Sequence, residues 1–406
     1  MKKQRGGGLV RFLLVLAVLA VIALRWEDVQ GLVSRAIVGT IRIAGNRREI
    51  AVDTEKTGER TQSTEPVQPE ETGEEEWYYY RKLHADDQEL YRDILDGVQE
   101  CRTTIPVEES DTEVIGRVYR YLLCDHPELF WCTGEMTITS YPLCAELEPV
   151  YLWTGEKLEK RKKRVEKAAA ACLSGVDVDA TDYQRVRHVF RYLVNHVDYN
   201  QNEKTNQSLY SALVRGESVC AGYSKAAQYL LQQLGIQCIY VTGTAGGEDH
   251  AWNIVRCDGM YYQMDVTFGD PTYSGEGNVS NNINYSYLCC TDEELYQDHT
   301  PSDLVKLPAC RSERLNYYKI HDRYYASYDA DVLLREMRRS TADGEASFFC
   351  KFPEEVYKQV CGDVTNNLLP EAARTLAQQY GLSSGRYTYV TDDLFHTITV
   401  YWDYNE

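Results

Sequence analysis

Cys220, His250 and Asp265 are the residues of this sequence whose types and order could do chemistry together. A thiolate attacks carbonyl carbon, an imidazole beside it moves the proton, and a carboxylate fixes the tautomer and orientation of the ring. Such a set performs acyl transfer on amides through a thioester. For each residue alone, packing in the core is an equally good interpretation. The three in this order favour a reactive site.

A helix must present the cysteine. Cys220 follows a short polar stretch and precedes apolar residues at helical spacing, and Gly235 follows them as a terminator. The sequence therefore predicts a helix that begins at Cys220. The unpaired N–H groups and the dipole at a helix start stabilise a thiolate, so this position suits a nucleophile.

A hairpin must present the other two residues. Two apolar runs, 250–257 and 260–266, flank the pair Asp258-Gly259, which is a strong signal for a two-residue type I′ turn. Cys257 would then pair with Met260, and Asp265 would lie opposite Trp252. This register makes His250 the diagonal neighbour of Asp265, at about 7–8 Å between Cα atoms, within reach of a side-chain bridge.

These motifs resemble the transglutaminase-like superfamily. The resemblance rests on residues 218–223 (SVCAGY), 250–253 (HAWN) and 262–267 (YQMDVT), and it covers roughly residues 180–310. It implies an α+β fold with a papain-like core, in which the cysteine-bearing helix packs on an antiparallel sheet. One departure is Phe268, at a packing position where these proteins often carry tryptophan.

The resemblance also implies a role for each site residue. Cys220 would be the nucleophile, His250 the general base and acid, and Asp265 the residue that orients the ring. The backbone N–H of Cys220 is one expected oxyanion donor, and Gln207 is the candidate for a second donor on its spacing. No cofactor and no metal site are predicted, because Cys289-Cys290 has no His or Asp cluster around it.

The N-terminus reads as a targeting segment. Residues 1–11 carry basic side chains without an acid, and thirteen apolar residues follow at 12–24. We predict a membrane anchor or signal segment at 1–26, a juxtamembrane segment at 27–52 and an acidic disordered linker at 53–76. The predicted location is the cell membrane, with the catalytic domain outside, as in exported bacterial proteins with such domains. Secretion after cleavage of a signal peptide is the alternative.

The remaining chain divides into three predicted regions: a mainly helical N-terminal region at 77–165, the catalytic core at 166–310 and a small α+β domain at 311–406. The apolar spacing predicts the following helices and strands. The helices are 78–98, 113–123, 156–171, 183–196, 330–339, 353–361 and 369–380, and the tail strands are 324–328, 346–352, 386–390 and 397–402.

Composition argues against several classes of partner and site. The 406 residues hold 43 Lys and Arg against 62 Asp and Glu, and this net charge of −19 argues against nucleic acid as a partner. The thirteen cysteines include no CxxC pair, which argues against a zinc ribbon or a thioredoxin-type site. The predicted partners are a protein or peptide substrate, peptidoglycan peptides included, and a membrane at the N-terminus. Hydrolysis and transfer to an amine both stay open, and the alternative function is a non-catalytic binding module with the same fold.

Overall fold

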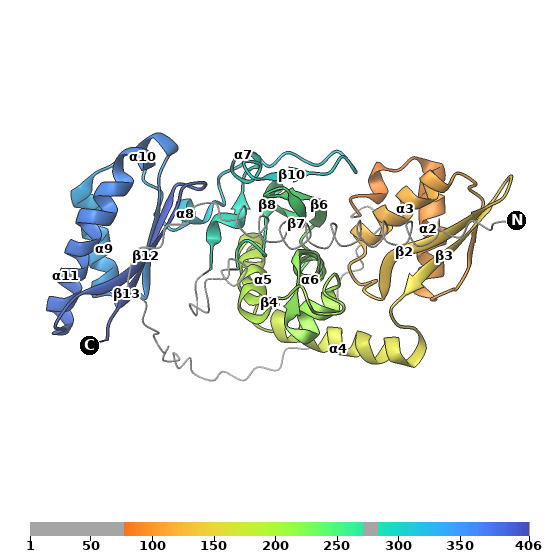
Figure 1. Cartoon of the computed structure of the whole chain (residues 1–406), viewed down its shortest axis with the longest axis horizontal. Coiled ribbons are helices and arrows are strands. Elements are labelled where there is room, and N and C mark those ends of the chain that lie inside the picture. Colours follow the sequence, from red (N-terminus) through yellow and green to blue (C-terminus); the bar gives the residue numbers. More distant parts are fainter. Residues whose placement is uncertain (1–76, 271–282, 406) are drawn as a thin grey trace, which may run out of the picture. The chain divides into compact units, whose positions relative to one another are not determined.

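The structure, a computed structural model, describes residues 77–270 and 283–405, which are coloured in Figure 1. The chain divides into two compact units between Tyr325 and Ala326. The predicted anchor, juxtamembrane segment and acidic linker lie outside the described residues. Within the described residues, no helix combines the length and the apolar character that crossing a membrane requires.

The first unit opens with helices and a three-stranded antiparallel sheet in the order β1-β3-β2. Its elements are η2 (Tyr80–Lys82), α2 (Ala85–Gln99), β1 (Ile105–Val107), α3 (Thr112–Asp125), β2 (Cys132–Ser140) and β3 (Ala145–Tyr151). The predicted helices 78–98 and 113–123 are thus confirmed as α2 and α3, although α2 begins later because the first residues form a 3₁₀ turn.

Asp125, at the end of α3, ties this region together. Its buried carboxylate accepts hydrogen bonds from the backbone N–H groups of Tyr79 and Tyr80, at 3.0 and 2.8 Å. Burial raises the pKa of Asp125 to about 6, against the lowering effect of these bonds. The backbone oxygen of Asp125 also accepts a bond from Gln232 of helix α6 (Cys220–Gln233), so the N-terminal region is fixed to the helix that carries Cys220.

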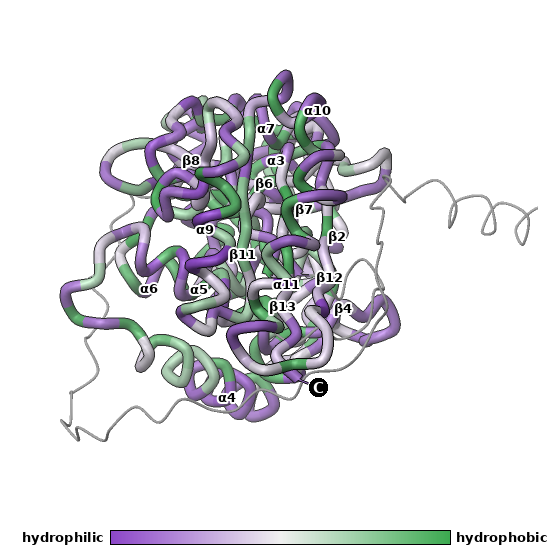
Figure 2. The backbone as a smooth tube through the Cα atoms, turned by 90° about the vertical axis from the view of Figure 1, so that its left-hand side faces the viewer, coloured by the Kyte–Doolittle hydropathy of each residue, from purple (hydrophilic) through white to green (hydrophobic). Residues whose placement is uncertain are grey.

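Two long helices lead to the core, and both confirm the predicted ranges. They are α4 (Gly155–Leu173) and α5 (Asp182–His196). Thr181 and Gln184 form a reciprocal capping box that starts α5. Figure 2 shows α4 changing from hydrophilic colours in its Lys/Arg-rich part to hydrophobic colours in its alanine-rich part.

The core is a five-stranded antiparallel sheet in the order β10-β6-β7-β8-β9. Its strands are β6 (Cys238–Ala245), β7 (Glu248–Cys257), β8 (Met260–Met264), β9 (Leu288–Cys290) and β10 (His299–Pro301). Helix α6 is fixed to β7 because Ser224 Oγ donates to the backbone oxygen of Ala251 at 2.8 Å and Asn253 Nδ2 donates to that of Ser224 at 3.1 Å. The predicted α+β core, a helix on an antiparallel sheet, is confirmed.

Short elements connect the core. They are β4 (Asp198–Tyr199) and β5 (Glu217–Ser218), which pair in parallel, the π-helical turn η3 (Ser211–Arg215), η5 (Tyr285–Tyr287), α7 (Asp292–Leu295) and α8 (Tyr317–Ile320).

The β7–β8 hairpin has the predicted register. Cys257 pairs with Met260 and Asn253 with Met264. The turn residues Asp258 and Gly259 have φ angles of 49° and 79°, as a type I′ turn requires at both central positions.

The second unit, from Ala326 onward, is a three-stranded antiparallel sheet with helices, which agrees with the predicted α+β tail, and the predicted boundary at 311 lies within the first unit. The sheet order is β11-β13-β12. The elements are α9 (Ala330–Ala342), β11 (Ser347–Lys351), α10 (Glu354–Asp363), η6 (Val364–Leu368), α11 (Leu369–Tyr380), β12 (Arg386–Asp392) and β13 (Thr397–Asp403).

The strand predicted at 324–328 is wrong. Only Tyr324 forms an isolated bridge there, and the next residues form a bend at the border between the two units. A single bridge pairs one residue only, so the succession of pairs that defines a strand does not form there, whatever the β-propensity of the tyrosines.

Candidate active site

Cys220 is the first residue of α6, as predicted, and its side chain is partly exposed. The residue at the N-cap is Val219, whose side chain cannot accept a hydrogen bond from the first turn. The N–H groups of Gly222 and Tyr223 donate instead to the backbone oxygen of Val219, which leaves those of Cys220 and Ala221 beside the thiol. The structure also places Gly235 in the left-handed region, with a φ of 71°, where it terminates this helix as predicted.

Gly222 lets a neighbouring turn approach the start of α6. A Cβ at this position would lie 1.9 Å from Ser218 Oγ and 2.8 Å from the backbone oxygens of Asn206 and Ser208. Ser218 Oγ in turn donates to the backbone oxygen of Asn206 at 2.7 Å. The first turn of α6 is thus held against residues 205–208 without room for a side chain.

Gln207 belongs to this turn. The backbone oxygen of Gln207 accepts a hydrogen bond from Lys225 Nζ at 3.3 Å, and Gln207 is exposed. The turn therefore lies at the correct end of α6 for an oxyanion donor. The donor role of the Gln207 side chain stays a prediction.

His250 and Asp265 meet as the hairpin register predicts. His250 Nε2 lies 2.6 Å from Asp265 Oδ2, and both side chains are buried. The other carboxylate oxygen, Oδ1, accepts a bond from the backbone N–H of Phe268 at 3.0 Å. The carboxylate is thereby held on both oxygens, and the orientation of the His250 ring is fixed through Nε2.

Electrostatics connect the histidine to the cysteine. Burial alone would lower the pKa of His250, but the Asp265 carboxylate and a hydrogen bond with the Cys220 side chain raise it to about 10. Since Nε2 is occupied by Asp265, Nδ1 is the ring nitrogen left for Cys220. His250 thus contacts Asp265 directly, and Cys220 lies close enough to His250 to contribute to its raised pKa.

His299 is a site residue that the sequence analysis missed. Its Nε2 lies 3.0 Å from Asp265 Oδ2, and its Nδ1 contacts Asp298 Oδ1. A carboxylate only accepts hydrogen bonds, so both ring nitrogens of His299 must carry a proton. Burial works against this charge, yet the two carboxylates raise the pKa of His299 above its ordinary value.

Asp265 is therefore shared between two imidazolium groups. Burial disfavours its charge, but His250 and His299 hold the pKa of Asp265 well below its ordinary value. Charges alternate along the line Asp298, His299, Asp265 and His250. No signal in the sequence marks His299, because β10 reaches the site only through its pairing with β6, where His299 lies opposite Ala245.

The same three groups could offer ligand atoms to a metal. Among the described residues, His250, Asp265 and His299 each present one such atom, all within 4.8 Å of one another. A zinc ion needs its nitrogen and oxygen ligands at about 2.0–2.2 Å. The contacts of 2.6 and 3.0 Å between Asp265 and the two rings are hydrogen bonds that an ion would have to replace. We therefore interpret His250, Asp265 and His299 as a hydrogen-bonded network and not as a metal site.

Aromatic rings enclose the two histidines. Phe268 lies edge-on to both, with centroids 5.0 Å from His250 and from His299, and Trp252 lies 5.2 Å from His299. Trp252 Nε1 donates to Gln263 Oε1 at 2.9 Å, and the amide of Gln263 is held by Asp292 and Tyr296. Phe268 thus packs against both histidines, at the position where the sequence analysis noted a departure from tryptophan.

The family comparison agrees with this geometry. Residues 170–266 match the family model of the transglutaminase-like superfamily. The chain contains a transglutaminase-like domain. This confirms the predicted family. The matched range includes Cys220, His250 and Asp265, and it ends before His299.

Relatives and solved structures match the transglutaminase-like domain over limited lengths. Kyphoscoliosis peptidase from Homo sapiens is 28% identical over 106 residues, which cover 22% of this chain and 16% of the relative. The chain thus spans about a sixth of the length of the curated relatives it matches. The crystal structure of a TGase aligns with 37% of this chain and 46% of its own, at 16% identity and a TM-score of 0.25. A proposed cysteine protease from Cytophaga hutchinsonii aligns with 32% and 61%, at 14% identity and a TM-score of 0.23.

Proposed function

We propose that the transglutaminase-like domain catalyses thiol-dependent acyl chemistry on amide bonds of proteins or peptides. The observation that carries the proposal is the contact between His250 and Asp265, with Cys220, the first residue of helix α6, close enough to contribute to the raised pKa of His250. The raised pKa of His250 makes an imidazolium the resting form at neutral pH. An imidazolium beside the sulfur attracts a thiolate.

The reaction follows from these positions. The Cys220 thiolate attacks the amide carbonyl carbon, and the negative charge that develops on the oxygen faces the N–H of Cys220, with Gln207 as the candidate second donor. The carbon–nitrogen bond then breaks, and His250 gives the proton from Nδ1 to the departing amine. Water or a second amine attacks the thioester, His250 takes its proton, and the thiolate is restored.

The acceptor decides between the two outcomes. Water yields a hydrolysed amide, as in a peptidase or amidase, and a primary amine yields a new amide, as in a cross-linking enzyme. An assay with a peptide amide therefore contains water alone in one arm and a lysine-like amine in the other. The alternative function, a binding module, predicts no turnover in either arm.

Alkylation of the thirteen cysteines tests the proposal directly. Burial raises the pKa of Cys124, Cys132 and Cys172 to about 12, so these thiols react slowly near neutral pH. We expect iodoacetamide at pH 6–7 to label Cys220 first, as read by peptide mass spectrometry. The Cys144→Ser variant removes an exposed competitor. If Cys220 reacts no faster than the other thiols in that variant, the proposal loses its support.

His299 is proposed as a positioning residue, and two variants test it. In His299→Phe, Asp265 loses a donor, and we expect kcat to fall about 10–100-fold. His299→Gln keeps a donor without the positive charge, so it should restore much of kcat. Both variants remove the positive charge of His299, so Asp265 stabilises the His250 imidazolium more strongly. The alkaline limb of the pH profile, which reports loss of the His250 proton, should therefore move to higher pH in both variants. Equal losses in both variants, with an unmoved limb, would indicate a merely structural role.

The proposed setting is the outer side of a membrane, with residues 1–26 as the anchor. It is supported by the thirteen apolar residues at 12–24 after a basic start and by the acidic composition of 53–76. Peptides accessible there, peptidoglycan peptides included, are the proposed substrates. Protease treatment of intact cells tests the setting, since a domain held inside would resist digestion.

A further inference from the structure

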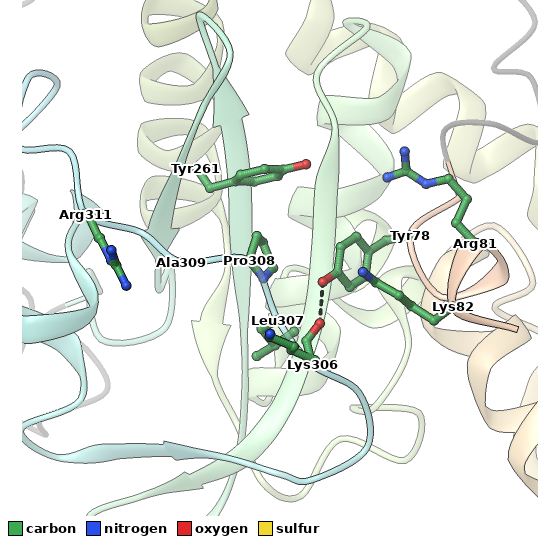
Figure 3. A pocket seen from close by; sticks show the side chains of 9 residues that line it. All are labelled: Tyr78, Arg81, Lys82, Tyr261, Lys306, Leu307, Pro308, Ala309 and Arg311. Atoms are coloured by element: carbon green, nitrogen blue, oxygen red, sulfur yellow. Dashed lines mark hydrogen bonds between the residues drawn. The ribbon is translucent and has the colours of Figure 1, made fainter.

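A second concave site lies in the first unit, apart from Cys220. It is a cavity of about 670 Å³ between the segment after Trp77, strand β8 and the loop that follows β10. Figure 3 shows its lining: Tyr78, Arg81, Lys82, Tyr261, Lys306, Leu307, Pro308, Ala309 and Arg311. In that view Tyr78 and Tyr261 face the same space, with Arg81 and Lys82 on one side and Arg311 on the other.

The lining carries only one sign of charge. Arg81, Lys82, Lys306 and Arg311 contribute four cations, and no acid from residues 77–270 or 283–405 lines the cavity. Among the described residues, none of these four forms an ion pair. Elsewhere on the same unit, surface arginines do find acids, as in Arg117 with Asp87 and Arg314 with Asp258, both at 2.8 Å or less. In a chain of net charge −19, four unpaired cations around one cavity form a marked positive site.

The apolar part of the cavity is held in place. Tyr78 Oη donates to the backbone oxygen of Lys306 at 2.6 Å, and Tyr261 Oη donates to Gln237 Oε1 at 3.0 Å. The ammonium of Lys82 lies 4.8 Å from the centre of the Tyr78 ring. Burial and the neighbouring Tyr261 raise the pKa of Tyr78 to about 12, so the Tyr78 ring stays neutral.

The cavity is separate from the Cys220 site, although one of its lining residues lies on the strand that leads to Asp265. Tyr261 lies on β8, and Asp265 directly follows the last residue of that strand, four positions later. At the usual rise of a strand, the two positions are about 13 Å apart. None of the catalytic candidates lines the cavity, so binding here does not require the reactivity of Cys220.

We propose that this cavity binds an acidic peptide segment of a protein partner. Carboxylates complement the four unpaired cations, and the rings of Tyr78 and Tyr261 accommodate the apolar parts of a peptide chain between them. An open cavity with cations on opposite sides fits an extended chain with several carboxylates better than a single small anion. The proposal goes beyond the proposed catalytic function and holds whether or not Cys220 reacts.

Fluorescence anisotropy tests the proposal on the full chain with Cys220→Ala, so that no turnover interferes. The probes are three labelled peptides of equal length, rich in glutamate, serine or lysine. We expect the glutamate peptide to bind and the other two to bind at least tenfold more weakly, and we expect added salt to weaken the binding. The double variant Arg81→Gln/Lys82→Gln should lose about tenfold in affinity, and Lys306→Gln/Arg311→Gln should behave alike.

The matched control is Lys163→Gln/Lys167→Gln. These exposed lysines lie on α4, outside the cavity, and their replacement changes the net charge by the same amount. It should leave the affinity unchanged. An equal loss in this control and in the cavity variants would overturn the site. A single-stranded oligonucleotide of equal charge that binds more tightly than the glutamate peptide would overturn the choice of a peptide.

Discussion

Cys220→Ala is expected to reduce amide hydrolysis and amine transfer by about 10³-fold or more, because the variant lacks the sulfur that would form the thioester beside His250. His250→Ala should cost a similar factor, since residues that act as a unit are not additive. The measurement is kcat/KM on a peptide amide, with release of ammonia or amine as the readout. The thermal midpoint of Cys220→Ala should change little, because the side chain is partly exposed.

Cys144→Ser is the matched control for this experiment. Cys144 is an exposed thiol on the connection between β2 and β3, away from the candidate site. Its removal should leave kcat/KM unchanged. Turnover that survives in Cys220→Ala, with the control equally active, would contradict the assignment of the nucleophile.

Asp265→Asn is expected to lower kcat by about 10⁴-fold, the size of effect known when the orienting carboxylate of a serine protease is replaced by an amide. The amide cannot hold His250 as an imidazolium, and it also leaves buried His299 without one of its two carboxylates. Breaking a buried ion pair by removing one partner costs about 3–5 kcal/mol of unfolding free energy. Urea unfolding of the wild-type protein and of Asp265→Asn measures this loss of unfolding free energy.

The pH dependence of that loss follows from the two shifts. The pKa of Asp265 is lowered, so its contribution is present above the ordinary carboxyl range and is lost in acid. The pKa of His250 is raised from 6.5 to about 10, so its contribution is complete below pH 6.5 and is lost as pH rises toward 10. The stability difference should therefore be largest near pH 5–6 and smaller at pH 9. A difference that grows with pH would contradict the imidazolium assignment.

Local signals accounted for much of the candidate site. The turn at Asp258-Gly259 needs positive φ at both positions, and this fixed the register from which the contact between His250 and Asp265 was predicted. The helix start at Cys220 could likewise be predicted, because apolar spacing and the terminator Gly235 lie within one short stretch. Both predictions depend on residues close together in the sequence.

Contacts between segments far apart in the sequence could not be predicted. His299 arrives on a three-residue strand whose partner is β6, more than fifty positions earlier, and three residues are too few to show a period. The cationic cavity is assembled from segments around Tyr78, Tyr261 and Lys306, which no local pattern connects. The same holds for the contact of Asp125 with α6, which depends on packing between regions that the sequence presents separately.

The two-residue turn of the β7–β8 hairpin decides where this protein can be engineered. One residue added between Asp258 and Gly259 would shift the register and move Asp265 to the opposite face of the sheet. Epitope tags and fluorescent-protein insertions should therefore avoid that turn. The connection between β2 and β3 suits them better, because Tyr141 and Leu143 are already exposed there, at 44% and 85%, and the strands it joins belong to a different sheet.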